Sequence, residues 1–252
     1  MKKSLIAGAL VFAALYPAAA GAAAFKGTVV SSQQARHVLV VSSSTGLVRT
    51  VHTGSAARVG AVVSVTAAKR ADGTFTASRV AVVGRAHKAR VQGVVLARAH
   101  GITFLSGNRS VIAVHSARRA LASVGDTTPP AGTVANIGVT IGTQGTLTQT
   151  SIKTVGQSSN IVIQATVDSI TPATATTAGS LVLKVGTQTF TIPLAAGTTL
   201  PATIVQGATV SLTISFGAEG ATASGDDEDD DDQGDDNDHN DDENDDDGSS
   251  GD

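Results

Sequence analysis

The densest group of side chains that could do chemistry lies at the C-terminal end of the chain, in residues 225–252. This tail holds seventeen Asp or Glu and no Lys or Arg. Carboxylate oxygens are the ligands that Ca²⁺ prefers, but an EF-hand loop around Gly234 would place Gln233 and Asn240 where stronger ligands belong. We therefore expect the tail to hold divalent cations weakly and without one fixed geometry. The candidate metal ligands are Asp226, Asp227, Glu228, Asp229, Asp230, Asp231, Asp232, Asp235, Asp236, Asp238, Asp241, Asp242, Glu243, Asp245, Asp246 and Asp247.

The same composition predicts that the tail is disordered, because it contains too few apolar residues to form a core and its charges repel one another. Two alternatives to cation binding stay open. The tail could serve only to keep the protein soluble. It could also mask the basic residues nearer the N-terminus, because a chain of this length can extend to about 90 Å.

The histidines form a second candidate group. His37 and His52 are fifteen residues apart, and so are His100 and His115. A two-residue hairpin loop at Gly107-Asn108 would place His100 directly opposite His115, and a similar turn would pair the other two. Facing imidazoles could share a Zn²⁺ or Cu²⁺ ion. The alternative is a surface pair without metal, since the chain has no cysteine and few carboxylates nearby to complete the coordination.

Basic residues dominate the N-terminal half of the mature chain. Residues 25–125 contain fourteen Lys or Arg and one acid, Asp72. Such a surface could bind polyanions, including phosphate-rich polymers of a cell envelope. We do not expect specific nucleic-acid binding, because proteins that hold single strands stack the bases on aromatic rings. Beyond the N-terminal leader the chain has five Phe and no Tyr or Trp.

Catalysis finds little support in the sequence. There is no nucleophile elbow, zinc-protease motif, glycine-rich phosphate loop or cysteine. Only four acids precede the tail, so an orienting carboxylate for a catalytic triad is scarce. We predict that the protein is not an enzyme. The sequence firmly implies no cofactor, and Ca²⁺ is the one candidate.

The first residues resemble a secretory signal peptide. Lys2 and Lys3 precede an apolar run, Leu5 to Tyr16, and small residues follow as far as Ala24. The run is too short to cross a bilayer comfortably, and we expect cleavage before Phe25 or, alternatively, after Ala20. The expected product is secreted, periplasmic or held at the cell surface, with no membrane span. An uncleaved membrane anchor is the other interpretation.

The elements that must carry these groups are β-strands, because Val and Thr are abundant and no helical period is evident beyond the leader. The stretch 60–84 predicts a strand, a turn at Asp72-Gly73 and another strand, and pieces of it return later in the chain. We predict an all-β array of three small OB-like five-stranded barrels, the third truncated, followed by the disordered acidic tail. The predicted bounds are 1–24 for the signal peptide, 25–86, 87–157 and 158–224 for the barrels, and 225–252 for the tail. Units this small are marginally stable alone, so neighbours should pack together.

The pattern of glycines and alternating apolar residues resembles a family of exported bacterial repeat domains of unknown function. In the first unit it is carried by Gly27, Gly60, Val63, Val65, Asp72, Gly73, Phe75 and Ala77. In the second it is carried by Gly93, Val139, Ile141, Gly145 and Leu147, and in the third by Gly207, Val210, Leu212 and Gly220. The resemblance implies small OB-like barrels and export, and it implies no catalytic residue.

Together these observations predict an exported, non-enzymatic binding protein of the matrix or cell surface, whose tail holds Ca²⁺ weakly. The alternative is a module that binds polyanions or the cell envelope and whose basic head is moderated by the acidic tail. The sequence leaves the oligomeric state open.

Overall fold

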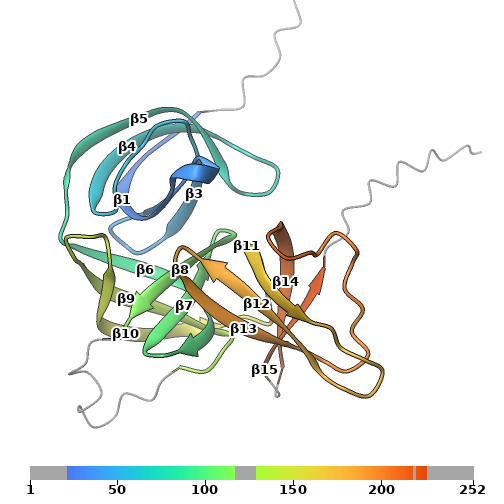
Figure 1. The fold of residues 1–252 in the computed structure, drawn as a ribbon. Helices are drawn as coiled ribbons and strands as arrows, with labels where there is room; N and C mark the ends of the chain where they lie inside the picture. The colour runs from blue at the N-terminus through green and yellow to red at the C-terminus, as the bar shows by residue number, and fades with distance from the viewer. Residues whose placement is uncertain (1–21, 117–128, 218–219, 226–252) are drawn as a thin grey trace, which may run out of the picture.

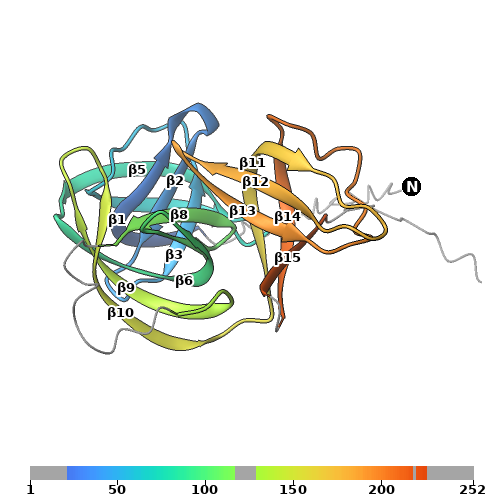
Figure 2. The same ribbon diagram turned by 60° about the horizontal axis from the view of Figure 1, so that its bottom comes forward.

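The computed structural model describes residues 22–116, 129–217 and 220–225, and these fold into β-strands with one short 3-10 helix (Figure 1). The all-β prediction is therefore confirmed. Three sheets of five strands follow one another along the chain, and two of them close into barrels. Figure 2 shows the third sheet beside the two barrels.

The first barrel closes in the order β1-β2-β3-β5-β4. Its elements are β1 (Ala23–Gln33), the 3-10 helix η1 (Gln34–Arg36), β2 (Val38–Ser42), β3 (Val48–His52), β4 (Ala61–Lys69) and β5 (Phe75–Arg85). The long β1 pairs with both β2 and β4, and β3 runs parallel to β5 where Val51 faces Phe75. Alternate residues of these strands fill the interior, as the twofold period of a strand requires.

The second barrel repeats this strand order. Its elements are β6 (Lys88–Ala99), β7 (Ile102–Gly107), β8 (Ser110–His115), β9 (Thr133–Ile141) and β10 (Leu147–Gln157). Its parallel closure is a single pair, Thr148 with His115.

The third unit is an open sheet, not the truncated barrel that the sequence predicts. Its strands are β11 (Asn160–Thr171), β12 (Gly179–Val185), β13 (Gln188–Leu194), β14 (Thr209–Gly217) and β15 (Gly220–Gly225), in the order β13-β12-β11-β14-β15. Among the described residues no hydrogen-bonded ladder joins β13 to β15. The fifth strand has six residues, whereas β5 and β10 have eleven each.

The second barrel adds side chains to the core of the open sheet. The outer face of β7 and β8 contributes Phe104 and Val111 to the same apolar cluster as Phe190 and Leu183 of the third sheet. The rings of Phe104 and Phe190 stack with centroids 4.7 Å apart. The first barrel packs on the second in the same way, because Val30, Val40 and Val48 on β1, β2 and β3 join the second core. The expectation that neighbouring units pack together is confirmed.

A glycine latch recurs in all three units. The first strand of each unit carries a bulge, and the residue before the bulge accepts a hydrogen bond from a glycine that precedes the fourth strand. The bonds run from Gly60 to Val29, from Gly132 to Val95 and from Gly207 to Val167, at 2.8, 2.9 and 2.8 Å. The three glycines have φ of 88°, 83° and 82°, which other residues adopt only with strain. The sequence indicates the first and last of them, but Gly132 is found only in the structure.

Candidate anion-binding site

Positive charge without a carboxylate partner is the main chemical feature of the described chain. The residues that the structure describes include fourteen Lys or Arg and two acids, Asp72 and Asp168. The ion pair among them joins Arg70 Nε to the Asp72 carboxylate at 3.8 Å. The remaining cations therefore face solvent or neutral groups within this part of the protein.

Several of these cations line three adjoining cavities, which we call the junction groove. The largest, of about 330 Å³, lies between the two barrels and is lined by Arg58 and Arg85 with Gln34. It shares Arg85 with a smaller cavity of about 150 Å³, beside His87. It shares Gln34 with a cavity of about 290 Å³, lined by Arg36 and Lys184, where all three sheets meet. No Asp or Glu is found among the described lining residues of the groove.

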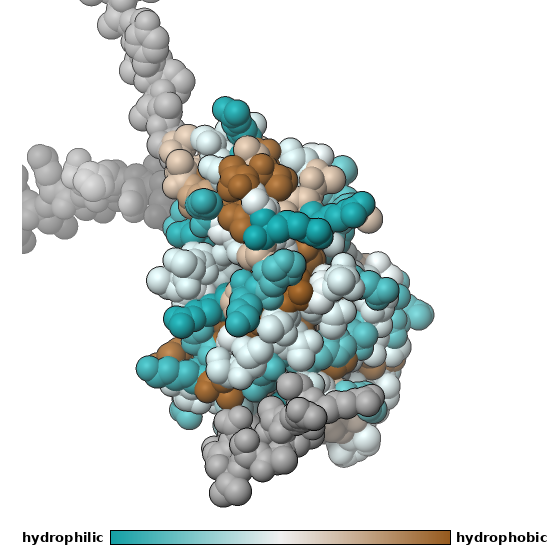
Figure 3. Space-filling view, turned by 90° about the vertical axis from the view of Figure 1, so that its left-hand side faces the viewer, coloured by the Kyte–Doolittle hydropathy of each residue, from teal (hydrophilic) through white to brown (hydrophobic). Residues whose placement is uncertain are grey.

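Each cation of the groove comes from a different segment. Arg36 ends η1, in the connection between β1 and β2 that Figure 1 draws on the side of the first barrel facing the third sheet. Arg58 lies between β3 and β4, Arg85 ends β5, and Lys184 lies near the end of β12. Figure 3 shows hydrophilic side chains beside apolar ones on one face of the molecule.

Arg36 is the least solvated cation of the groove. Burial lowers the pKa of its guanidinium, although an arginine stays charged in proteins. Its side chain donates one hydrogen bond, from Nη1 to Gln33 Oε1 at 3.2 Å. A guanidinium has five N–H donors in a planar fork that matches carboxylate, sulfate or phosphate. The side chain is therefore placed to bind an anion that enters the cavity.

The charge of this region also acts on His52. Burial is the main cause that lowers the pKa of its imidazole, and the charge of Arg70 is the next. Arg36 lowers it further, while Asp72 raises it. His52 is therefore neutral at neutral pH.

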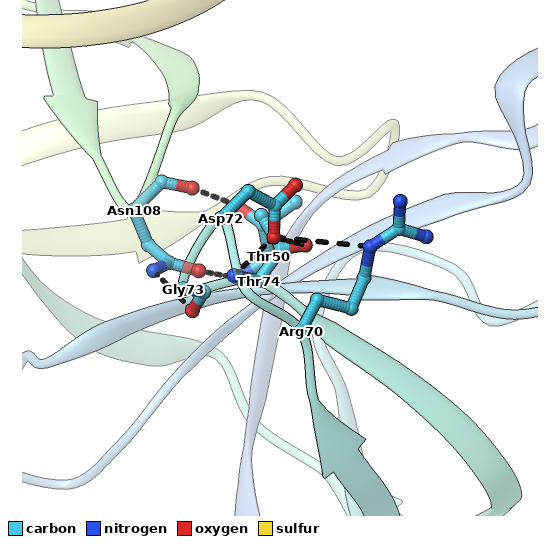
Figure 4. Close-up of polar contacts among 6 residues, drawn as sticks. All are labelled: Thr50, Arg70, Asp72, Gly73, Thr74 and Asn108. Atoms are coloured by element: carbon cyan, nitrogen blue, oxygen red, sulfur yellow. Dashed lines mark hydrogen bonds and ion pairs between the residues drawn. The ribbon is translucent and has the colours of Figure 1, made fainter. Parts of the chain in front are cut away.

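The tip of the β7–β8 hairpin fixes the geometry of the junction (Figure 4). Asn108 Oδ1 accepts a hydrogen bond from the Thr50 backbone N–H at 2.7 Å, and its Nδ2 donates to the Gly73 carbonyl at 3.0 Å. On the other side, the Arg109 carbonyl accepts from the Gln164 N–H at 2.7 Å. One hairpin thus contacts both the first barrel and the third sheet.

The turn at Asp72-Gly73 supports the same contact. Gly73 has φ of 79°, and its backbone N–H closes a four-residue turn by donating to the Arg70 carbonyl at 3.0 Å. The Asp72 carboxylate accepts hydrogen bonds from the backbone and the hydroxyl of Thr74, at 2.9 and 2.6 Å. Burial alone would raise the pKa of this carboxyl, but these bonds together with the charges of Arg70 and Arg109 leave it lowered.

The structure corrects the predicted register of the histidine pairs. The hairpin loop is Asn108-Arg109, and β7 and β8 pair Ile102 with His115, so His100 does not lie opposite His115. In the first barrel Val38 pairs with His52. Metal binding by these histidines stays an untested prediction whose geometric basis is wrong. Within residues 22–116, 129–217 and 220–225, no group of three or more His, Asp or Glu could hold a metal ion.

The predicted ligands in the polyacidic tail, Asp226 to Asp247, lie outside the described residues. The described part of the chain contains no helix that is both long and apolar enough to cross a membrane.

The aromatic side chains are engaged with one another, away from the groove. Phe104 is buried against Phe190, and Phe25 meets Phe75 edge to face at 5.3 Å. The Arg49 guanidinium lies 4.7 Å from the centre of the Phe25 ring. None of the five Phe belongs to the described lining of the groove.

The strand order defines the class of fold. A five-stranded barrel in which the first strand pairs with the second and fourth, and the third runs parallel to the fifth, is an OB-like barrel. Both closed barrels of the chain have this order, and the open sheet has it without the closure.

Comparison with known proteins does not assign the chain to a family. No family model and no curated protein matches the chain. Among solved structures, the CSD456 structure of Drosophila Unr is 14% identical, with 80% of this chain and 95% of that chain covered and a TM-score of 0.19. A multidomain protein with nucleic acid binding domains from Streptococcus pneumoniae TIGR4 is 10% identical, with coverages of 80% and 72% and a TM-score of 0.22. With TM-scores this low, the fold class rests on the strand order alone.

Proposed function

We propose that the chain is an exported, non-enzymatic protein that binds an extended polyanion in the junction groove. The observation that carries the proposal is the groove itself, in which Arg36, Arg58, Arg85 and Lys184 gather with no acid in the described lining. Sulfate, phosphate and carboxylate groups accept paired hydrogen bonds from guanidinium. A polymer that carries such groups along its length would contact several of these cations at once.

The partner that fits this arrangement is a polyanion of the cell envelope or matrix, recognised by charge. Base stacking is not part of the proposal, since the Phe side chains pack in the cores or against one another. Binding should weaken steeply with salt, because the screening length falls from about 10 Å at 0.1 M to about 3 Å at 1 M ionic strength.

The test uses heparin as the polyanion and the full-length protein in isothermal titration calorimetry. Replacing Arg58→Gln together with Arg85→Gln should weaken binding about tenfold, since two exposed charge contacts of roughly 0.7 kcal/mol each are lost. The matched control is Arg79→Gln with Arg98→Gln, which removes the same charge from exposed positions outside the groove. An equal loss in both pairs, or no binding by the unaltered protein, would refute the proposal.

Export is part of the proposal, and the start of β1 bears on it. Ala23 and Ala24 pair with Ala67 and Thr66 of β4. Cleavage after Ala20 would leave this pairing complete, whereas cleavage before Phe25 would remove two paired residues. The mass of the mature N-terminal peptide from exported protein distinguishes the two sites, and an intact leader on the exported protein would contradict both.

Divalent-cation binding by the tail is the second candidate, favoured by its seventeen acids. Calcium titration of the full-length protein should show weak binding in roughly the millimolar range. It should disappear in a full-length variant whose tail acids are changed to Asn and Gln. Equal calcium binding by both proteins would rule out the tail as the site.

A further inference from the structure

The cavity where the three sheets meet contains two cations and no described counter-ion. Arg36 and Lys184 line it together with Gln34, Gln164 and Thr166. The cavity is about 290 Å³ in volume, enough for a carboxylate-bearing side chain. Partial burial of a cation costs free energy unless an anion compensates it, so this cavity is the most favourable place in the groove for a carboxylate.

The described chain ends close to this cavity. Gly225 pairs with Leu212 of β14, and Leu212 pairs with Ile163 of β11. Neighbouring strands lie about 4.8 Å apart, so Gly225 is about 10 Å from Ile163. The next residue of β11, Gln164, lines the cavity. The tail, which follows Gly225, therefore begins within reach of Arg36 and Lys184.

The geometry points to a specific occupant: we infer that the chain's own polyacidic tail, residues 226–252, docks on the Arg36–Lys184 cavity through its carboxylates. A tethered segment reaches effective concentrations of roughly millimolar, and the tail offers seventeen acids to two cations. The tail would compete there with a polyanion in the rest of the groove. The inference rests on the proposed function in one respect, since both require the groove to attract anions.

The test is zero-length crosslinking of the full-length protein with a water-soluble carbodiimide. The reagent joins a carboxylate to a lysine amine as an amide, and it takes up the water that is lost. We expect crosslinks from the tail chiefly to Lys184, mapped by mass spectrometry. The other described lysines, Lys26, Lys69, Lys88 and Lys153, serve as internal controls. Crosslinks spread evenly over the five lysines would overturn the inference.

Lys184 could also be crosslinked preferentially because it lies near the start of the tail. A variant of Arg36, the other cation of the cavity, is therefore needed. Arg36→Gln should lower the yield at Lys184 about threefold, the effect of losing roughly 0.7 kcal/mol from one ion pair. Arg79→Gln, an exposed arginine of β5 outside the groove, should leave the yield unchanged. Equal yields in the two variants would also overturn the inference.

A second measurement separates this inference from the proposed function. The variant with amide side chains in the tail should bind heparin more tightly than the unaltered protein at low salt. If heparin binds but its affinity is the same for both proteins, the tail is not a competitor and the inference fails while the proposed function stands. If the crosslink forms at Lys184 and heparin does not bind, the proposed function fails and tail docking stands.

Discussion

Asn108 offers the sharpest test of how the two barrels are joined. Its side chain makes two hydrogen bonds to the first barrel, to the Thr50 N–H and the Gly73 carbonyl. Its backbone is in the left-handed region, with φ of 48°, which Asn tolerates better than most residues. Replacing it therefore separates two effects, the loss of hydrogen bonds and the strain of the backbone.

The expected magnitudes follow from these two effects. Asn108→Ala loses both hydrogen bonds, at about 1 kcal/mol each, and places a Cβ residue with no local polar contact in the left-handed region, at about 1 kcal/mol. The free energy of unfolding should fall by about 3 kcal/mol. Asn108→Gly removes the strain and should lose about 2 kcal/mol. Asn108→Asp keeps the acceptor for Thr50 but sets a carboxylate oxygen against the Gly73 carbonyl, so it should lose more than the about 1 kcal/mol of one hydrogen bond.

The assay is urea unfolding followed by far-ultraviolet circular dichroism, because the chain has no Trp. The Gly variant should be more stable than the Ala variant, and all three variants should be less stable than the unaltered protein. If the Ala variant is as stable as the Gly variant, backbone strain does not contribute. If all three match the unaltered protein, the hairpin tip does not hold the barrels together.

Three further predictions concern other parts of the structure. Phe104→Ala should lower the free energy of unfolding by about 3–5 kcal/mol, because it empties the buried centre shared by the second barrel and the third sheet; a loss near 1 kcal/mol would contradict that shared core. Gly27→Ala should destabilise the first barrel, since its Cβ would lie 2.5 Å from a backbone oxygen. The control is Gly54→Ala, whose Cβ meets nothing within 4 Å and which should be neutral in thermal unfolding. Similar melting temperatures for the two variants would be inconsistent with the close approach at Gly27. The pKa of Asp72 is lowered in the folded protein, so its contribution to stability is present above its unfolded pKa of about 3.9 and is lost as pH falls through the folded value. The Asp72→Asn variant should therefore lose less stability on acidification than the unaltered protein. Parallel profiles of stability against pH for the two proteins would disprove the assignment.

The strands could be predicted well from the sequence because their signal is local. Alternating apolar residues mark β4 and β9, whose buried and less buried positions alternate along much of each strand. The turn at Gly73 and the latch glycines Gly60 and Gly207 also stand out, because a positive φ restricts the choice of residue at a single position.

The hairpin of β7 and β8 shows why a register can be misread. Gly107 looks like a turn residue, yet it lies in β7, where a Cβ would approach the Cβ of Val48 to 3.0 Å. The glycine is needed for the contact with the first barrel, while Asn108 and Arg109 form the turn with φ of 48° and 65°. A sequence does not distinguish a glycine required by a neighbour from a glycine required by a turn.

The candidate site could be predicted only as an excess of charge. Arg36, Arg58 and Arg85 belong to the basic half of the chain, but Lys184 stands among neutral residues and carries no local signal. The four cations line adjoining cavities because the packing of three sheets brings their segments together. That packing depends on contacts between residues far apart in the chain, which periodicity does not report.

The outer face of β12 and β13 differs from the corresponding faces of the two barrels. In the two barrels the corresponding faces present Val40 and Phe104 to the next unit, which buries them. In the third sheet the outward positions include Lys184, Thr189 and Thr191, which are exposed. A fourth unit, or another copy of the chain, would find no apolar platform among them on which to stack. The outward positions of this strand pair thus offer a more polar surface for stacking than the matching strands of the two barrels do.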